Sequence, residues 1–120
     1  MEIKEALNSL VQKVEGGIAS VVISMEGEAI DCCSKEPGFD VEWIGARYGL
    51  VVRDILSTVS RLNQGVVRSI VLELQKAILV VTPLNDLFFL VLLVHQDGNL
   101  GQALFQCRIL APALEEELSI

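Results

Sequence analysis

Hydrophobic positions recur at two different spacings along the chain, and the spacings divide it into eight elements. Apolar residues three and four positions apart predict amphipathic helices over 3–15, 41–63 and 100–118. Runs rich in valine, leucine and isoleucine predict five strands, at 18–24, 29–33, 66–74, 77–84 and 87–95. The predicted order of elements is therefore αββαβββα.

The last predicted strand, 87–95, is apolar at almost every position. A strand with one face in water would alternate, so this strand is covered on both faces. The links between strands are short, which favours antiparallel neighbours and the strand order 2-1-5-4-3. The sequence thus predicts a three-layer α/β/α sandwich with a five-stranded antiparallel sheet. The long apolar run from 77 to 94 is broken by Pro83 and Asn85-Asp86, so its pieces are too short to span a membrane.

The middle helix, 41–63, is apolar on two faces. One stripe is expected to pack on the sheet; it comprises Ile44, Tyr48, Val51, Val52, Ile55, Val59 and Leu62. The opposite face has small residues where charges are expected. Glycines inside an exposed helix cost close to 1 kcal/mol each relative to alanine. This favours a partner helix from a second copy; the alternative is that Gly45 and Gly49 lie under the chain's own loop.

The strand 66–74 lies at an edge of the predicted sheet. An exposed edge of this length promotes aggregation unless it is covered or paired. Pairing with the same edge of a second copy would continue the sheet, which favours a homodimer. The alternative is a lone edge blunted by Arg68 and Glu73.

Charge and reactive residues narrow the class of function. Sixteen acidic and nine basic residues give a net charge of −7, and the basic residues are scattered, which argues against nucleic-acid binding and against anionic membrane surfaces. The acidic start and three cysteines in no metal-binding pattern indicate the cytoplasm. His95 has no nucleophile or acid placed beside it by a motif, and Cys32-Cys33 is not a C-x-x-C pair. We therefore expect no catalytic site, metal or cofactor, and no enzyme.

The element order and several segments resemble the roadblock/LC7 family. The segments are "EGGIASVVISMEGEAI" (15–30), the middle helix and "GVVRSIVLELQKAILVVTPLNDLFFLVLLVHQDGNLGQALF" (65–105), with "PL" in the fourth strand and "NLG" at the start of the last helix. The resemblance covers nearly the whole chain and implies a single profilin-like domain over 1–120. It also implies homo- or heterodimers that pair through the middle helix and the third strand. The implied dimer positions are Gly45, Ala46, Gly49, Leu50, Arg53, Leu56, Ser69, Val71 and Glu73.

The resemblance further implies a non-enzymatic scaffold or regulator of a small Ras-like GTPase, including GTPase-activating partners. Trp43, Arg47 and Arg61 are the candidate contacts, because tryptophan beside arginine is typical of interface hot spots. The alternative for Trp43 is that it caps the sheet edge or packs under the loop "SKEPGF". The alternative function is a small-molecule sensor or a structural profilin-like domain. The aliphatic core argues against a ligand, because it has few polar groups to orient one.

Overall fold

The computed structural model describes residues 1–36, 38 and 40–119, with only the backbone described at 41–42 and 45–46. Its elements follow the predicted order. They are α1 (Ile3–Lys13), β1 (Gly17–Ser24), β2 (Ala29–Ser34), α2 (Val41–Ser60), β3 (Ile70–Glu73), β4 (Ala77–Leu84), β5 (Phe88–His95) and α3 (Leu100–Leu118).

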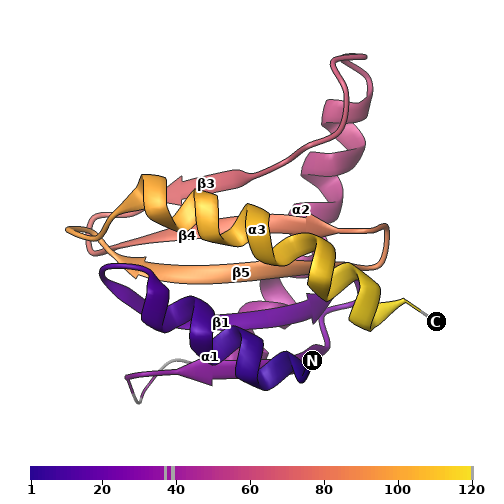
Figure 1. The fold of residues 1–120 in the computed structure, drawn as a ribbon. Helices are drawn as coiled ribbons and strands as arrows, with labels where there is room; N and C mark the ends of the chain where they lie inside the picture. The colour runs from indigo at the N-terminus through magenta and orange to yellow at the C-terminus, as the bar shows by residue number, and fades with distance from the viewer. Residues whose placement is uncertain (37, 39, 120) are drawn as a thin grey trace.

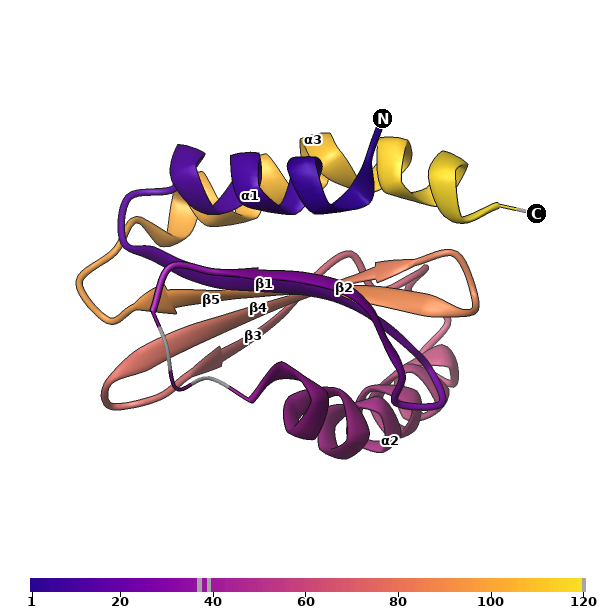
Figure 2. The ribbon, with the colours of Figure 1, turned by 90° about the horizontal axis from the view of Figure 1, so that it is seen from below.

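The five strands form one sheet in the order β2-β1-β5-β4-β3, and every neighbouring pair is antiparallel (Figure 1). Helices α1 and α3 cover one face of the sheet, and α2 lies on the other (Figure 2). This confirms the predicted three-layer sandwich, its strand order and its element order.

The two hydrophobic cores meet at the central strand β5, whose side chains alternate between them. Leu90, Leu92 and Val94 pack in the core under α1 and α3. Phe89, Val91 and Leu93 pack in the core under α2. All six are less than a tenth exposed, and burying a side chain of this size contributes roughly 1.5–3 kcal/mol. Burial on both faces explains why the segment shows no polar alternation.

Helix α2 meets the sheet through Ile44, Tyr48, Val52 and Leu56, four residues apart. The prediction that Val51 and Leu62 also face the sheet is wrong: they are 46% and 64% exposed. Val51 is turned about 100° from Val52 around the helix axis. Leu62 lies beyond the last helical residue, Ser60.

Strand β3 is shorter than predicted, because only Ile70–Glu73 pairs with β4. The pairing of Ile70 with Val81 would place Arg68 opposite Pro83 if the ladder continued. Proline has no N–H to donate and is found where a ladder is interrupted. The segment before β3 therefore leaves the sheet, and Val66 is 89% exposed.

Candidate interaction surface

Helix α2 presents large side chains to the outside as well as to the sheet. We call Trp43, Arg47, Leu50, Val51 and Arg53 the α2 outer face, and all five are exposed. Trp43 is 55% exposed and Leu50 is 65% exposed. A water-exposed helix face normally carries charged and polar residues, whereas this face combines three large apolar side chains with two arginines, so it is the candidate interaction surface.

Two local interactions hold Trp43 in place. The Asp40 side chain caps α2 by accepting a hydrogen bond from the Trp43 backbone N–H, at 3.0 Å. The Arg47 guanidinium lies 5.3 Å from the centre of the Trp43 ring, one helical turn further on. Cation–π contacts at exposed sites contribute about 0.5–1 kcal/mol. The ring is thus pre-positioned while half its surface stays open. Pro37 and Phe39 of the loop "SKEPGF" lie outside the described residues, so packing of Trp43 under that loop stays a prediction.

Two residues assigned to the dimer surface face their own chain instead. Gly49 is buried, and a Cβ there would lie 3.3 Å from the Gly27 nitrogen and 3.4 Å from the Met25 oxygen, both in the β1–β2 turn. The alternative reading, in which the glycine lies under the chain's own loop, therefore holds for Gly49. Leu56 is half-buried and packs on the core below α2. Gly45 and Ala46 lie in α2, where only the backbone is described.

Arg61 shares its side of α2 with Trp43 but not its neighbourhood. It is exposed and forms the C-cap of the helix. Eighteen residues at about 1.5 Å each separate the two along the axis by roughly 27 Å. The structure therefore does not bring Trp43 and Arg61 into one contact site within a single protomer, although Trp43 and Arg47 do meet.

The open edge of β3 carries the remaining predicted dimer positions. Ile70 and Leu72 pack in the core under α2, so Val71 and Glu73 alternate onto the opposite face. Ser69 lies just before the strand. Val71 is 39% exposed, and Glu73 is exposed. The Ser69 hydroxyl is buried and has no hydrogen-bond partner within the described part of the chain. The edge of β3 is therefore unpaired among the described residues of the protomer and carries an exposed valine.

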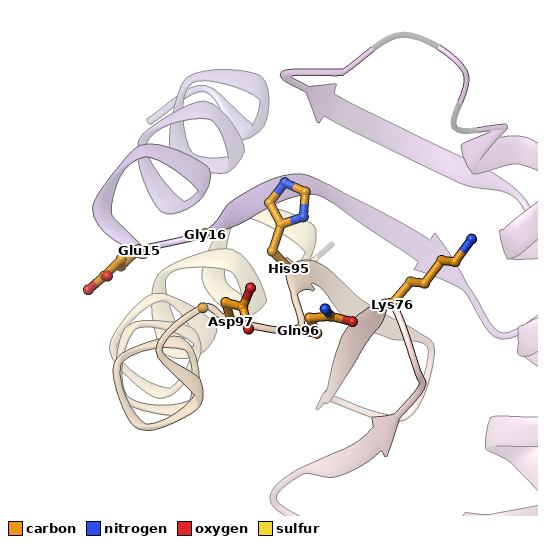
Figure 3. Close-up of a pocket in the computed structure, with 7 residues that line it drawn as sticks. Glu15, Gly16, Lys76, His95, Gln96 and Asp97 are labelled. Atoms are coloured by element: carbon orange, nitrogen blue, oxygen red, sulfur yellow. The ribbon is translucent and has the colours of Figure 1, made fainter.

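The shallow pocket in Figure 3 lies around His95, the only histidine of the chain. It has a volume of about 410 Å³ and is lined by Glu15, Gly16, Lys76, His95, Gln96, Asp97 and Gly98. In Figure 3 the side chains of Glu15 and Lys76 point away from His95 to opposite sides. The His95 Nε2 instead lies 3.0 Å from the Glu36 Oε1. These residues form no arrangement of nucleophile, base and orienting acid.

The cysteines behave as separate thiols. Cys32 packs in the core under α2 and Cys33 in the core under α1 and α3, so the pair faces opposite sides of β2. Cys107 is buried, as predicted for the apolar face of the last helix. Burial raises the pKa of the Cys107 thiol to about 11, although the nearby Thr82 side chain lowers it in part.

The described residues contain no cluster of three or more His, Cys, Asp and Glu side chains able to hold a metal ion. Over the same part of the chain, no helix combines the length and the hydrophobicity needed to cross a membrane.

No protein-family model matches the sequence, and no curated protein matches it. Solved structures do match. A roadblock/LC7 domain from Streptomyces avermitilis is 19% identical with a TM-score of 0.87, covering 100% of both chains. MglC from Myxococcus xanthus is 28% identical with a TM-score of 0.72, covering 98% of this chain and 100% of that one. An MglB described as having a tetrameric arrangement is 15% identical with a TM-score of 0.84, covering 93% and 84%.

The fold is therefore a profilin-like α/β/α sandwich, and a profilin from Acanthamoeba castellanii matches 97% of the chain with a TM-score of 0.64. Within that class the matching structures include roadblock/LC7 domains and the proteins MglB and MglC. These matches confirm the resemblance read from the sequence: the chain has the roadblock/LC7 fold.

Proposed function

We propose that this chain is a non-enzymatic cytoplasmic interaction module that forms a dimer and binds a small Ras-like GTPase. The observation that carries the proposal is the α2 outer face, with its exposed Trp43, Leu50 and Val51. The roadblock/LC7 fold supports the same class of function, since the resemblance implies regulators of such GTPases. The tetrameric arrangement named for an MglB of similar fold supports self-association.

The open edge of β3 supports the proposed dimer. Two copies of an edge strand pair in antiparallel fashion when a two-fold axis runs normal to the sheet. Such an axis keeps both copies of α2 on the same face of a continuous sheet. Centring the pairing on Val71 places the two valines opposite each other and sets Ser69 opposite the second copy's Glu73. This register packs the two valines against each other and keeps the two glutamates apart.

The two copies of α2 then form a platform for the partner. Leu50 and Arg53, with Gly45 and Ala46, contribute to the contact between copies. Trp43, Arg47 and Arg61 remain for the GTPase. Arg61 of one copy can approach Trp43 of the other if the two helices run antiparallel, which the two-fold axis favours. This would combine residues that one protomer holds about 27 Å apart.

The alternative of a ligand sensor is less well supported. A void between Ile44 of α2 and the sheet has a volume of only about 10 Å³. A void of that size holds about one water molecule. A ligand under Ile44 would have to displace the helix, whereas a hollow of about 510 Å³ lies further along, between Leu56 and Val59 of α2 and Pro83 of β4.

Cysteine cross-linking tests the dimer. In a background with Cys32 and Cys33 changed to serine, Val71→Cys should form a disulfide-linked dimer under mild oxidation, because opposed residues lie about 5 Å apart. Glu73→Cys is the matched control: its two copies would lie roughly 14 Å apart along the strands and should not link. If Val71→Cys stays monomeric on a non-reducing gel, or if both variants link equally, the proposed pairing is wrong.

Affinity capture tests the partner. Wild-type protein and a Trp43→Ala variant are used as baits, with GTP-analogue or GDP added, and mass spectrometry identifies what is retained. A Ras-like GTPase should be enriched by the wild type and depleted with the variant. Equal enrichment by both baits would show that Trp43 does not contribute to binding of the GTPase.

A further inference from the structure

A second surface lies away from the α2 outer face, between α3 and the segment before β3. It is a cavity of about 330 Å³ at the end of β4. Its apolar lining comprises Val67, Pro83, Ala111 and Pro112. Thr82 forms part of its lining and is only 4% exposed. The Thr82 hydroxyl lies beside the Cys107 thiol, and no oxygen or nitrogen of the described residues bonds to it.

The charged groups of this cavity are two arginines and one glutamate. Arg68 comes from the segment before β3, and Arg108 comes from α3. Glu115 also lines the cavity, but within the described residues it forms no ion pair with either arginine within 4.0 Å. The site therefore carries one unbalanced positive charge in a chain whose net charge is −7.

We propose that this cavity binds an acidic side chain from an extended segment of a partner protein. A guanidinium presents a planar fork of donors that matches a carboxylate. A carboxylate at this place would balance the net charge of the two arginines and Glu115. The apolar walls favour a polypeptide over a free anion, because the stem of a glutamate and its apolar neighbours bury surface against Val67, Pro83 and Pro112. A free phosphate or acetate gains nothing from those walls.

The site is independent of the proposed GTPase platform. Arg108 belongs to a helix that lies across the sheet from α2 (Figure 2). If two copies pair through β3 as proposed, both cavities open on the side of the sheet away from the α2 platform. The two surfaces can then be occupied together, which would let the protein join a GTPase to an acidic partner. Binding in the cavity requires neither the dimer nor the GTPase.

Fluorescence anisotropy with the full chain tests the site. The probe is a short fluorescein-labelled peptide in which glutamate and valine alternate, and the matched peptide has glutamine in place of glutamate. Arg68→Gln and Arg108→Gln should each weaken binding of the glutamate peptide at least tenfold, which is about 1.4 kcal/mol. Glu115→Gln should strengthen it, because a competing carboxylate is removed. Lys35→Gln, the same charge change at an exposed position outside the cavity, should have no effect.

Three results would overturn the proposal. The first is no binding of the glutamate peptide to the wild type at millimolar concentration. The second is an equal loss in Lys35→Gln, which would mean diffuse electrostatic attraction. The third is displacement of the peptide by acetate or phosphate at concentrations equal to its own, which would make this a small-anion site only. Circular dichroism melting confirms that each variant is folded, and Val71→Cys cross-linking in the same variants separates a failure here from a failure of the dimer.

Discussion

Gly49 and Leu50 are neighbours in α2, and the same substitution at each should have opposite consequences. Gly49 is buried against the β1–β2 turn, whereas Leu50 is 65% exposed. We expect Gly49→Glu to destabilise the fold and Leu50→Glu to leave the fold intact while weakening the dimer. The pair therefore separates packing within a protomer from packing between copies.

The magnitude follows from how firmly the turn is held. The Met25 N–H donates to the Leu87 carbonyl at 2.8 Å, and the Gly27 N–H donates to the Ser24 carbonyl at 2.9 Å. A Cβ at position 49 would lie 3.3 Å from the Gly27 nitrogen, so the turn must move by a few tenths of an ångström even for alanine. The better helix propensity of alanine is about 1 kcal/mol and offsets that shift. Gly49→Ala should therefore change the free energy of unfolding by less than about 1 kcal/mol.

A glutamate at position 49 cannot be accommodated in the same way. Its side chain must either be buried with its charge or push α2 away from the turn, which opens the contact of Val52 with the sheet. Overpacking costs about 1–3 kcal/mol, and burying an unpaired polar group adds a similar amount. We expect a loss of at least about 3 kcal/mol, a large share of the 5–15 kcal/mol typical of a domain. Leu50→Glu should change the stability by less than about 0.5 kcal/mol, as surface substitutions usually do.

Urea unfolding and light scattering on the same samples measure both effects. Unfolding is followed at protein concentrations below the dissociation constant of the dimer, because dimerisation itself adds apparent stability. A Gly49→Glu variant with wild-type stability and a lost dimer would refute this reasoning and return Gly49 to the interface between copies. A destabilised Leu50→Glu monomer would show that Leu50 packs within its own chain.

Three further outcomes are expected. Trp43→Ala should lower the free energy of unfolding by no more than about 1 kcal/mol, the value of an exposed cation–π contact. It should nevertheless weaken GTPase binding at least tenfold in titration calorimetry. A much lower melting temperature would show that Trp43 stabilises the fold instead. Asp40→Ala removes the N-cap of α2 and should cost about 1 kcal/mol in urea unfolding, whereas Asp40→Asn should cost less. The pKa of Cys107 is raised from 9.0 to about 11. Below pH 9 the thiol stays protonated in the folded and the unfolded chain, so the free energy of unfolding keeps its full value. Between pH 9 and 11 only the unfolded chain loses the proton, so the free energy of unfolding falls. The loss should reach roughly 3 kcal/mol at about 1.4 kcal/mol per pH unit, and it should be absent from Cys107→Ala. Iodoacetamide should label Cys32 and Cys33 before Cys107.

Much of the architecture could be predicted because it depends on local periodicity. Strand β5 is apolar at every buried position, so its place at the sheet centre follows from the sequence alone. Short links at Gln75-Lys76 and Asn85-Asp86 make neighbours of β3, β4 and β5, which gives that part of the strand order. The apolar spacing of α3 correctly placed Cys107 in the core. Each of these conclusions needs only the repeat of a helix or strand and the length of a connection.

The tertiary structure decided which side of α2 faces what. A helix that is apolar on two faces gives no unique orientation from its periodicity, since stripes one residue apart differ by only about 100°. Leu56 packs on the sheet, whereas Val51 is exposed to solvent. The β1–β2 turn, which is distant in sequence, covers Gly49. The cavity between Arg68 and Arg108 likewise joins residues forty positions apart, which no local pattern connects. Local spacing determined the elements of this protein, while long-range packing determined which of its faces remain available to a partner.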